Sequence, residues 1–86
     1  MHVVAIHTIR DPDSFFRAIE AEPLPQGMAL HTTLPNEDSS RMVCLWEADS
    51  LEDVEQLVNR TVGEFSDNEF FQVRPDATQG LPVLTA

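Results

Sequence analysis

The feature that most constrains this fold is the order in which strand-like and helix-like segments alternate between short turn sequences. The segment from His2 to Ile9 is rich in β-branched residues and stops at "RDPD", which indicates a largely buried strand. Asp11 then offers an N-cap and Pro12 a first helical position, while "EAEPLPQG" ends the helix with two prolines and a glycine. The chain therefore begins as a strand followed by a helix.

The remaining segments predict a hairpin of two strands, then a second helix and a fourth strand. Residues 28–34 alternate between apolar and semi-polar side chains, and residues 42–46 return after the polar turn "PNEDSS" as the second arm of a hairpin. Ser50 with Asp53 resembles a capping box before a helix with an apolar stripe. "GEFSDN" ends that helix, and "EFFQVR" predicts a fourth strand before Pro75.

This order predicts an α+β, ferredoxin-like βαββαβ sandwich: an antiparallel four-stranded sheet, strand order 4-1-3-2, with two helices on one face. Residues 1–75 form the domain in this prediction, and residues 76–86 form a C-terminal tail. A chain of 86 residues buries only about 60 to 65% of its unfolded surface. Because the other face of the sheet keeps apolar residues, we expect a homodimer that forms a dimeric α/β barrel.

Charge and cysteine content narrow the range of partners and compartments. Fifteen acidic residues against five basic ones give a net charge of −10, which argues against nucleic acid and anionic membrane surfaces as partners. The single cysteine, Cys44, cannot form an internal disulfide and is expected to be a buried small hydrophobe. No signal sequence or membrane span is visible in the sequence. We therefore expect a cytoplasmic protein.

Several polar residues fall near predicted strand ends. With strands 1 and 3 expected to run parallel and opposite to strands 2 and 4, one edge of the sheet would collect two imidazoles and one or two carboxylates. Such groups suit a divalent transition metal such as nickel or zinc. His2 is assigned to the opposite edge, without a role. The predicted metal ligands are His7, His31, Glu47 and Glu69.

The direction of each side chain depends on which face of the sheet it takes. In strand 1, Val4 and Ile6 are expected under the helices and His7 on the open face; in strand 2, Leu34 is expected under the helices and His31 and Thr33 on the open face. Strand 3 is ambiguous, so either Trp46 or Glu47 borders the open face. The residues expected to line a pocket there are Thr33, Cys44, Trp46, Asn68 and Phe70.

The stretch "LHTTLPNEDSSRMVCLWEADSLEDVEQLV", with the later "NEFFQV", resembles small ferredoxin-like proteins of unknown function, among them a small nickel-binding family. Those relatives share a Leu-His pair in strand 2, a hairpin with an acidic turn and a Cys-x-aromatic-Glu-Ala strand end. The resemblance implies a dimeric α/β barrel with metal held by its side chains. The corresponding residues here are Leu30, His31, Cys44, Trp46, Glu47 and Ala48.

Three functions remain open from the sequence. The first is binding of a divalent transition metal, nickel or zinc, for sequestration or sensing. The second is a cofactor-free enzyme of the monooxygenase or isomerase type, in which His7 or His31 acts as a general base on a small apolar ligand. The third is a module without a ligand that serves only dimerisation or assembly. Both histidines could also be ordinary strand residues held by hydrogen bonds.

Overall fold

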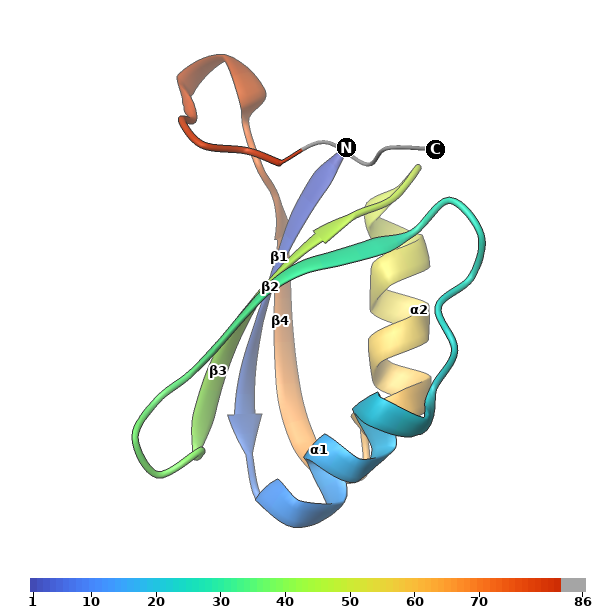
Figure 1. The fold of residues 1–86 in the computed structure, drawn as a ribbon, viewed down its shortest axis with the longest axis vertical. Coiled ribbons are helices and arrows are strands. Elements are labelled where there is room, and N and C mark those ends of the chain that lie inside the picture. The colour runs from blue at the N-terminus through green and yellow to red at the C-terminus, as the bar shows by residue number, and fades with distance from the viewer. Residues whose placement is uncertain (83–86) are drawn as a thin grey trace.

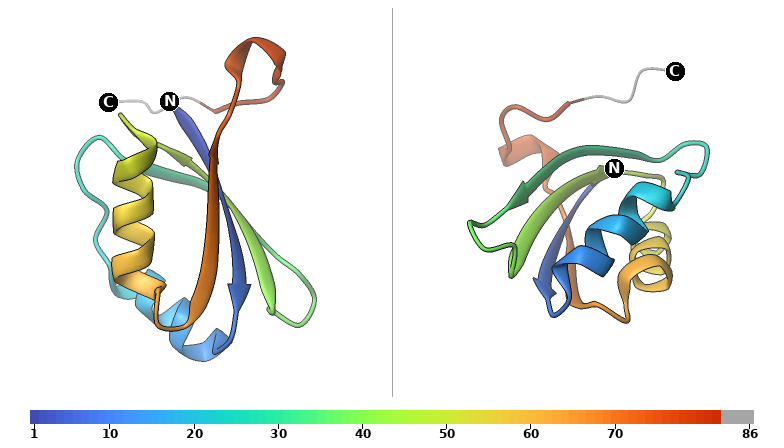
Figure 2. Two further views of the ribbon diagram at one scale, coloured as in Figure 1. Left: turned by 180° about the vertical axis from the view of Figure 1, so that it is seen from behind. Right: turned by 60° about the horizontal axis from the view of Figure 1, so that its bottom comes forward.

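The computed structural model describes residues 1–82 and confirms the predicted βαββαβ order. Both helices cover one face of the sheet, and within residues 1–82 no helix or strand covers the other face, which we call the open face (Figures 1 and 2). The last residues of the predicted tail, 83–86, lie outside the described residues. The elements are β1 His2–Ile9, α1 Pro12–Ala21, β2 Ala29–Pro35, β3 Arg41–Glu47, α2 Leu51–Val62, β4 Ser66–Gln72 and the 3₁₀ turn Pro75–Ala77.

The strands lie in the order β2-β3-β1-β4, the predicted order read from the other edge. Every neighbouring pair is antiparallel, including β1 with β3. The expectation that the first and third strands run parallel is therefore wrong. The crossover through α1 makes β1 and β2 parallel, and the hairpin inserts β3 between them in the opposite direction. The end of β1 consequently lies against the start of β3.

The faces of β1 are also the reverse of the expectation. Val3, Ala5 and His7 are buried beneath the helices, whereas Val4 and Ile6 are only partly buried and lie on the open face. Apolar residues occupy both faces of this central strand, so alternation in the sequence does not identify the core side. The antiparallel register then places Cys44 and Phe70 beside Ala5 on the helix side.

The two arms of the hairpin differ because β2 is irregular. In β3, Met42, Cys44 and Trp46 are buried, so Glu47 borders the open face. In β2 the register shifts between Leu30 and Thr32, which reverses the alternation beyond this bulge. Thr33 therefore pairs with Cys44 of the helix-side set, and Leu34 pairs with Val43 on the open face. This is the opposite of the expectation for Thr33 and Leu34.

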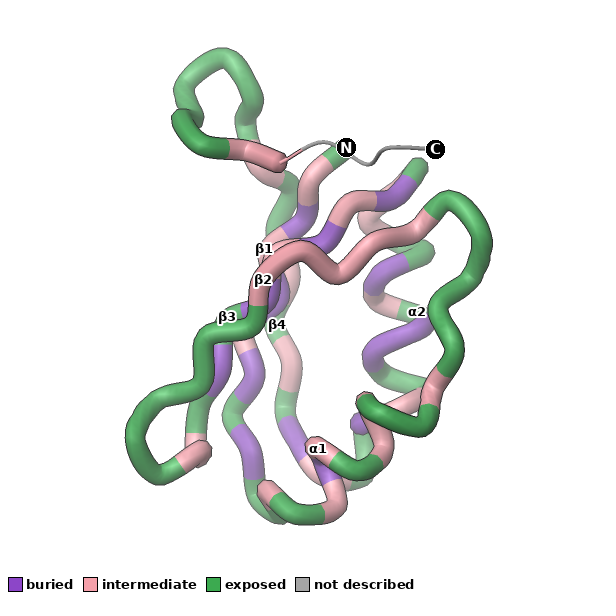
Figure 3. Tube along the Cα trace, in the orientation of Figure 1, coloured by how far each residue is buried: buried purple, intermediate pink, exposed green. Residues whose placement is uncertain are grey.

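The core lies between the sheet and the two helices (Figure 3). Both predicted N-caps form: the Asp11 carboxylate accepts from the Ser14 backbone N–H, and the Ser50 hydroxyl accepts from that of Asp53. β4 begins at Ser66, earlier than predicted, because its backbone pairs with β1 despite the polar sequence. Among the described residues, no helix is long and apolar enough to cross a membrane.

Candidate functional site

Glu47, the last residue of β3, anchors a group of polar side chains on the open face. Its Cα is paired with His2 on one side and with Ala29 on the other. The pairing of β1 with β3 extends one residue beyond His2 and Glu47. The Met1 nitrogen donates to the Ala48 carbonyl oxygen at 2.7 Å, and the Ala48 N–H donates to the Met1 carbonyl oxygen at 3.0 Å. These bonds fix His2 beside Glu47.

The β2 bulge brings a second imidazole to the same carboxylate. His31 falls within the register shift, and its Nε2 lies 2.9 Å from Glu47 Oε1. His2 Nε2 lies 3.6 Å from the same oxygen, and the two imidazole rings are 5.9 Å apart. We call His2, His31 and Glu47 the His-Glu cluster. One ligand atom from each member lies within 4.8 Å of the other two.

The His-Glu cluster is partly shielded from water. The side chains of His2 and His31 are each 14% exposed and that of Glu47 is 19% exposed. The segment after β4 returns over this end of the sheet, and His2 Nε2 lies 2.5 Å from the carbonyl oxygen of Pro82. A backbone hydrogen bond also holds the start of this segment, because the Val73 N–H donates to the His2 carbonyl oxygen at 2.9 Å.

The donor set of the cluster suits a borderline divalent metal. Zinc binds imidazole nitrogen and carboxylate oxygen at about 2.1 Å, so two ligand atoms in a tetrahedral site lie about 3.4 Å apart. The His31–Glu47 separation of 2.9 Å and the His2–Glu47 separation of 3.6 Å bracket that value. Two imidazoles with one carboxylate also form the facial ligand set of iron(II) sites. The residues present therefore fit a first-row divalent cation.

Only two of the predicted ligands, His31 and Glu47, belong to this cluster. His7 pairs with Met42, five residues along β3 from Glu47, which corresponds to about 16 Å. Glu69 is exposed and pairs with Ile6, near the middle of the sheet. His2 was not among the predicted ligands because the first and third strands were expected to run parallel. An antiparallel pairing would have placed His2, at the start of β1, opposite Glu47, at the end of β3.

His7 instead belongs to the core. It is 1% exposed, and its ring packs edge-on against Phe15 of α1 with centroids 5.2 Å apart. Its Nδ1 lies 2.6 Å from Asn68 Oδ1. Burial lowers the pKa of His7 because the charged imidazolium loses its hydration, and the hydrogen bond with Asn68 opposes this shift in part.

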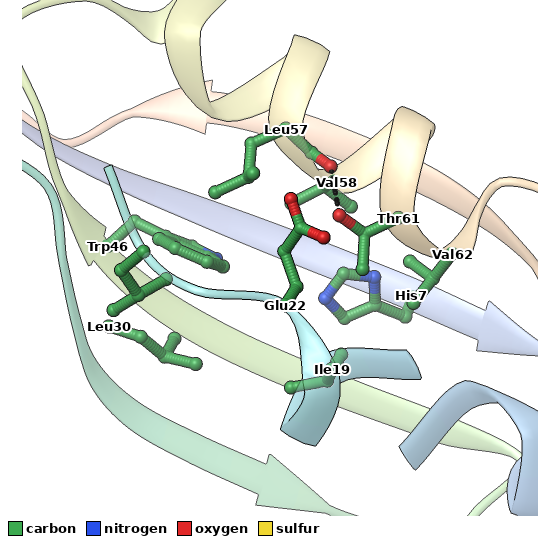
Figure 4. Close-up of a pocket in the computed structure, with 10 residues that line it drawn as sticks. His7, Ile19, Glu22, Leu30, Trp46, Leu57, Val58, Thr61 and Val62 are labelled. Carbon is green, nitrogen blue, oxygen red and sulfur yellow. Dashed lines mark hydrogen bonds between the residues drawn. The ribbon is translucent and has the colours of Figure 1, made fainter. Parts of the chain in front are cut away.

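A cavity of about 150 Å³ lies between the sheet and the helices, next to His7 (Figure 4). We call it the helix-side cavity. Trp46 lines it from β3, so Trp46 and Glu47 point to opposite faces of the same strand end. Trp46 is the one predicted pocket residue that lines this cavity. The residues that line the cavity are His7, Ile19, Glu22, Leu24, Leu30, Trp46, Leu57, Val58, Thr61 and Val62.

The other predicted pocket residues have different surroundings. Cys44 is buried, and burial raises the pKa of its thiol to about 12, which leaves it unreactive as a nucleophile near neutral pH. Phe70 packs against the core from β4, and Thr33 is exposed near the end of β2. Asn68 contacts His7 rather than the cavity.

No family model matches the chain, and no curated protein or solved structure matches it either.

Proposed function

We propose that this protein binds a divalent first-row transition metal, nickel or zinc, through the His-Glu cluster. The observation that carries the proposal is the convergence of His2, His31 and Glu47 from three adjacent strands at ligand-like separations. The cluster includes His31 and Glu47, two of the six residues that correspond to the pattern shared with small nickel-binding proteins. Metal sequestration or sensing is the function that such a site would serve.

The local chemistry supports binding by neutral imidazoles. A Nε2–H on His31 is within hydrogen-bond distance of the Glu47 carboxylate, and His2 Nε2 faces both that carboxylate and the Pro82 carbonyl. A cation would bind each Nε2 through its lone pair, and each neutral ring would then carry its proton on Nδ1. A doubly protonated imidazolium has no lone pair to offer, so metal affinity would fall as pH falls. Pro82 would then offer a neutral carbonyl oxygen close to the ion. Partial burial limits the competition from water for the same ligands.

We further propose that a second copy of this chain covers the open face. Val4, Ile6, Val43 and Leu45 give this face an apolar centre between the edge strands. A twisted sheet is matched in curvature by an identical sheet, and a two-fold pairing needs only one self-complementary surface. The His-Glu cluster lies on this same face, so a dimer would reduce its exposure further.

The test of the metal proposal is elemental analysis of untagged protein after equilibration with nickel or zinc and removal of free metal. We expect stoichiometric metal in the parent and at least tenfold weaker binding in His2→Ala, His31→Ala and Glu47→Gln. Thermal unfolding provides an independent readout, because metal at 100 times its Kd stabilises the folded state by about 2.7 kcal/mol.

His7→Gln is the matched control, since His7 is the remaining histidine of the chain and lies beneath the helices. It should retain full metal binding once its fold is verified by circular dichroism. A parent that holds no metal, or histidine variants of the cluster that bind as the parent does, would refute the proposal.

A further inference from the structure

The helix-side cavity contains two unmet hydrogen-bonding groups. Among residues 1–82, the buried side-chain polar atoms without a partner in the protein are His7 Nε2 and Trp46 Nε1. Both residues line this one cavity, and both are at least 95% buried, with exposures of 1% and 5%. Folded proteins rarely leave buried polar groups unpaired, so two such groups at one cavity point to a ligand that pairs with them.

The hydrogen bonds around Asn68 determine what His7 offers to that ligand. The amide nitrogen of Asn68 lies 3.1 Å from Asn59 Oδ1 and 3.5 Å from the Ser66 carbonyl oxygen, both of which are acceptors. The Asn68 side-chain oxygen therefore faces His7, and His7 Nδ1 must carry the proton that it accepts. In a neutral imidazole this leaves Nε2 as an acceptor, and it has no hydrogen-bond partner among the described residues.

Trp46 offers the opposite group. An indole nitrogen is a donor only, so the Trp46 Nε1–H requires an acceptor atom. A ligand that satisfies both residues must supply an O–H or N–H to His7 and an oxygen or nitrogen lone pair to Trp46. Hydroxyl groups supply both functions.

The remaining lining sets the size and charge of the ligand. A volume of about 150 Å³ matches cavities that accept a single benzene ring. Glu22 also lines the cavity, and its carboxylate forms an ion pair with Arg60 at 3.0 Å. Because Arg60 is not among the lining residues, the negative charge of Glu22 would repel an anion in the cavity. The side chains that line the rest are mainly aliphatic, as Figure 4 shows: Ile19, Leu30, Leu57, Val58 and Val62.

We infer that the helix-side cavity is a binding site for a neutral, ring-sized, mainly apolar molecule that carries hydroxyl groups. His7 Nε2 accepts a hydrogen bond from the molecule, and the Trp46 Nε1–H donates one to it. This site is independent of the proposed metal function, because the His-Glu cluster lies on the other face of the sheet.

The test uses metal-free protein titrated with resorcinol, phenol and toluene, three ring-sized probes that differ in their number of hydroxyl groups. The chain contains one tryptophan, so its indole N–H gives a single resonance in a ¹⁵N NMR spectrum. We expect saturable shifts of this resonance and of the His7 Nε2 nitrogen with the hydroxylated probes. Each hydrogen bond gained should tighten binding by about tenfold relative to toluene.

His7→Leu and Trp46→Phe remove the two polar atoms while keeping apolar bulk, and calorimetry then measures their affinities for the same probes. Each variant should lose about tenfold of the preference for the hydroxylated probes. Ile9→Val is the control, because Ile9 is buried in the same core but does not line the cavity. It should keep the parental preference despite a lower stability.

Three outcomes would overturn the inference. The hydroxylated probes could fail to bind, which would mean that water satisfies the two nitrogens. They could bind no more tightly than toluene. Finally, the folded His7→Leu and Trp46→Phe variants could keep the full preference of the parent. Because the parent's NMR shifts report on both nitrogens directly, a variant that does not fold leaves the test decisive.

Discussion

At the scale of single residues, His7 illustrates how burial fixes the charge of an ionisable group. The pKa of His7 is lowered because the imidazolium would lose its hydration in the core. The neutral ring still forms its bond with Asn68, and it packs against Phe15. Lowering the pH therefore destabilises the folded protein through this residue, because His7 accepts a proton more readily in the unfolded chain than in the folded one.

This difference predicts a pH dependence of stability that belongs to His7. The contribution is present in full above the unfolded-state pKa of about 6.5 and is lost as pH falls toward the lower folded-state value, by at most about 1.4 kcal/mol per pH unit. His7→Gln should remove this part of the dependence. Urea unfolding of both proteins between about pH 7.5 and about pH 5 measures the difference. Parallel curves for the two proteins would contradict this assignment.

At the scale of elements, α2 depends on its N-cap. The Ser50 hydroxyl accepts from the Asp53 N–H at 3.1 Å, and the buried side of the helix packs on the sheet through Val54 and Leu57. Ser50→Ala should lower the free energy of unfolding by about 1 kcal/mol, whereas Ser50→Asp should retain most of it, because a carboxylate also caps a helix. Chemical denaturation measures both changes. Equal losses in the two variants would show that the hydroxyl is not acting as a cap.

The elements and their order in the sheet could be predicted from the sequence, whereas the relative direction of the first and third strands was predicted wrongly. The Asp11 and Ser50 caps, the breaks at "EAEPLPQG" and "PNEDSS", and the strand order follow from turn chemistry and crossover rules. The predicted ligand set placed His7 beside Glu47 because it assumed that the first and third strands are parallel. These strands are antiparallel, so His7 lies at the far end of β3 from Glu47.

Face assignments were limited for a different reason. Both faces of β1 carry apolar residues, so Val3 and Val4 are equivalent by sequence alone, although one is buried and the other only partly so. The bulge after Leu30 has no glycine to mark it, yet it reverses the direction of Leu34. The buried face of β1 carries His7 to the helix-side cavity, and the bulge in β2 allows His31 to reach Glu47.

In the molecule as a whole, the two proposed sites lie on opposite faces of the sheet. The helix side holds the cavity, whereas the open face holds the His-Glu cluster and an apolar surface that includes Val43, Phe71 and Leu34. The net charge of −10 makes an anionic surface an unfavourable cover for this face. In the proposed dimer, a second copy would cover the apolar centre and would leave the helix side of each chain accessible.

The oligomeric state follows as a prediction with a matched pair of variants. Leu34 lies on the open face and is 62% exposed, whereas Leu24 lies beyond α1, lines the cavity on the helix side and is 46% exposed. Leu34→Lys places a charge in the proposed interface and should weaken the dimer by at least tenfold, because an unpaired buried charge is costly. Leu24→Lys makes the same chemical change outside the interface and should leave the dimer intact. Sedimentation velocity over a range of concentrations distinguishes them, and a monomeric parent would exclude the paired-sheet arrangement.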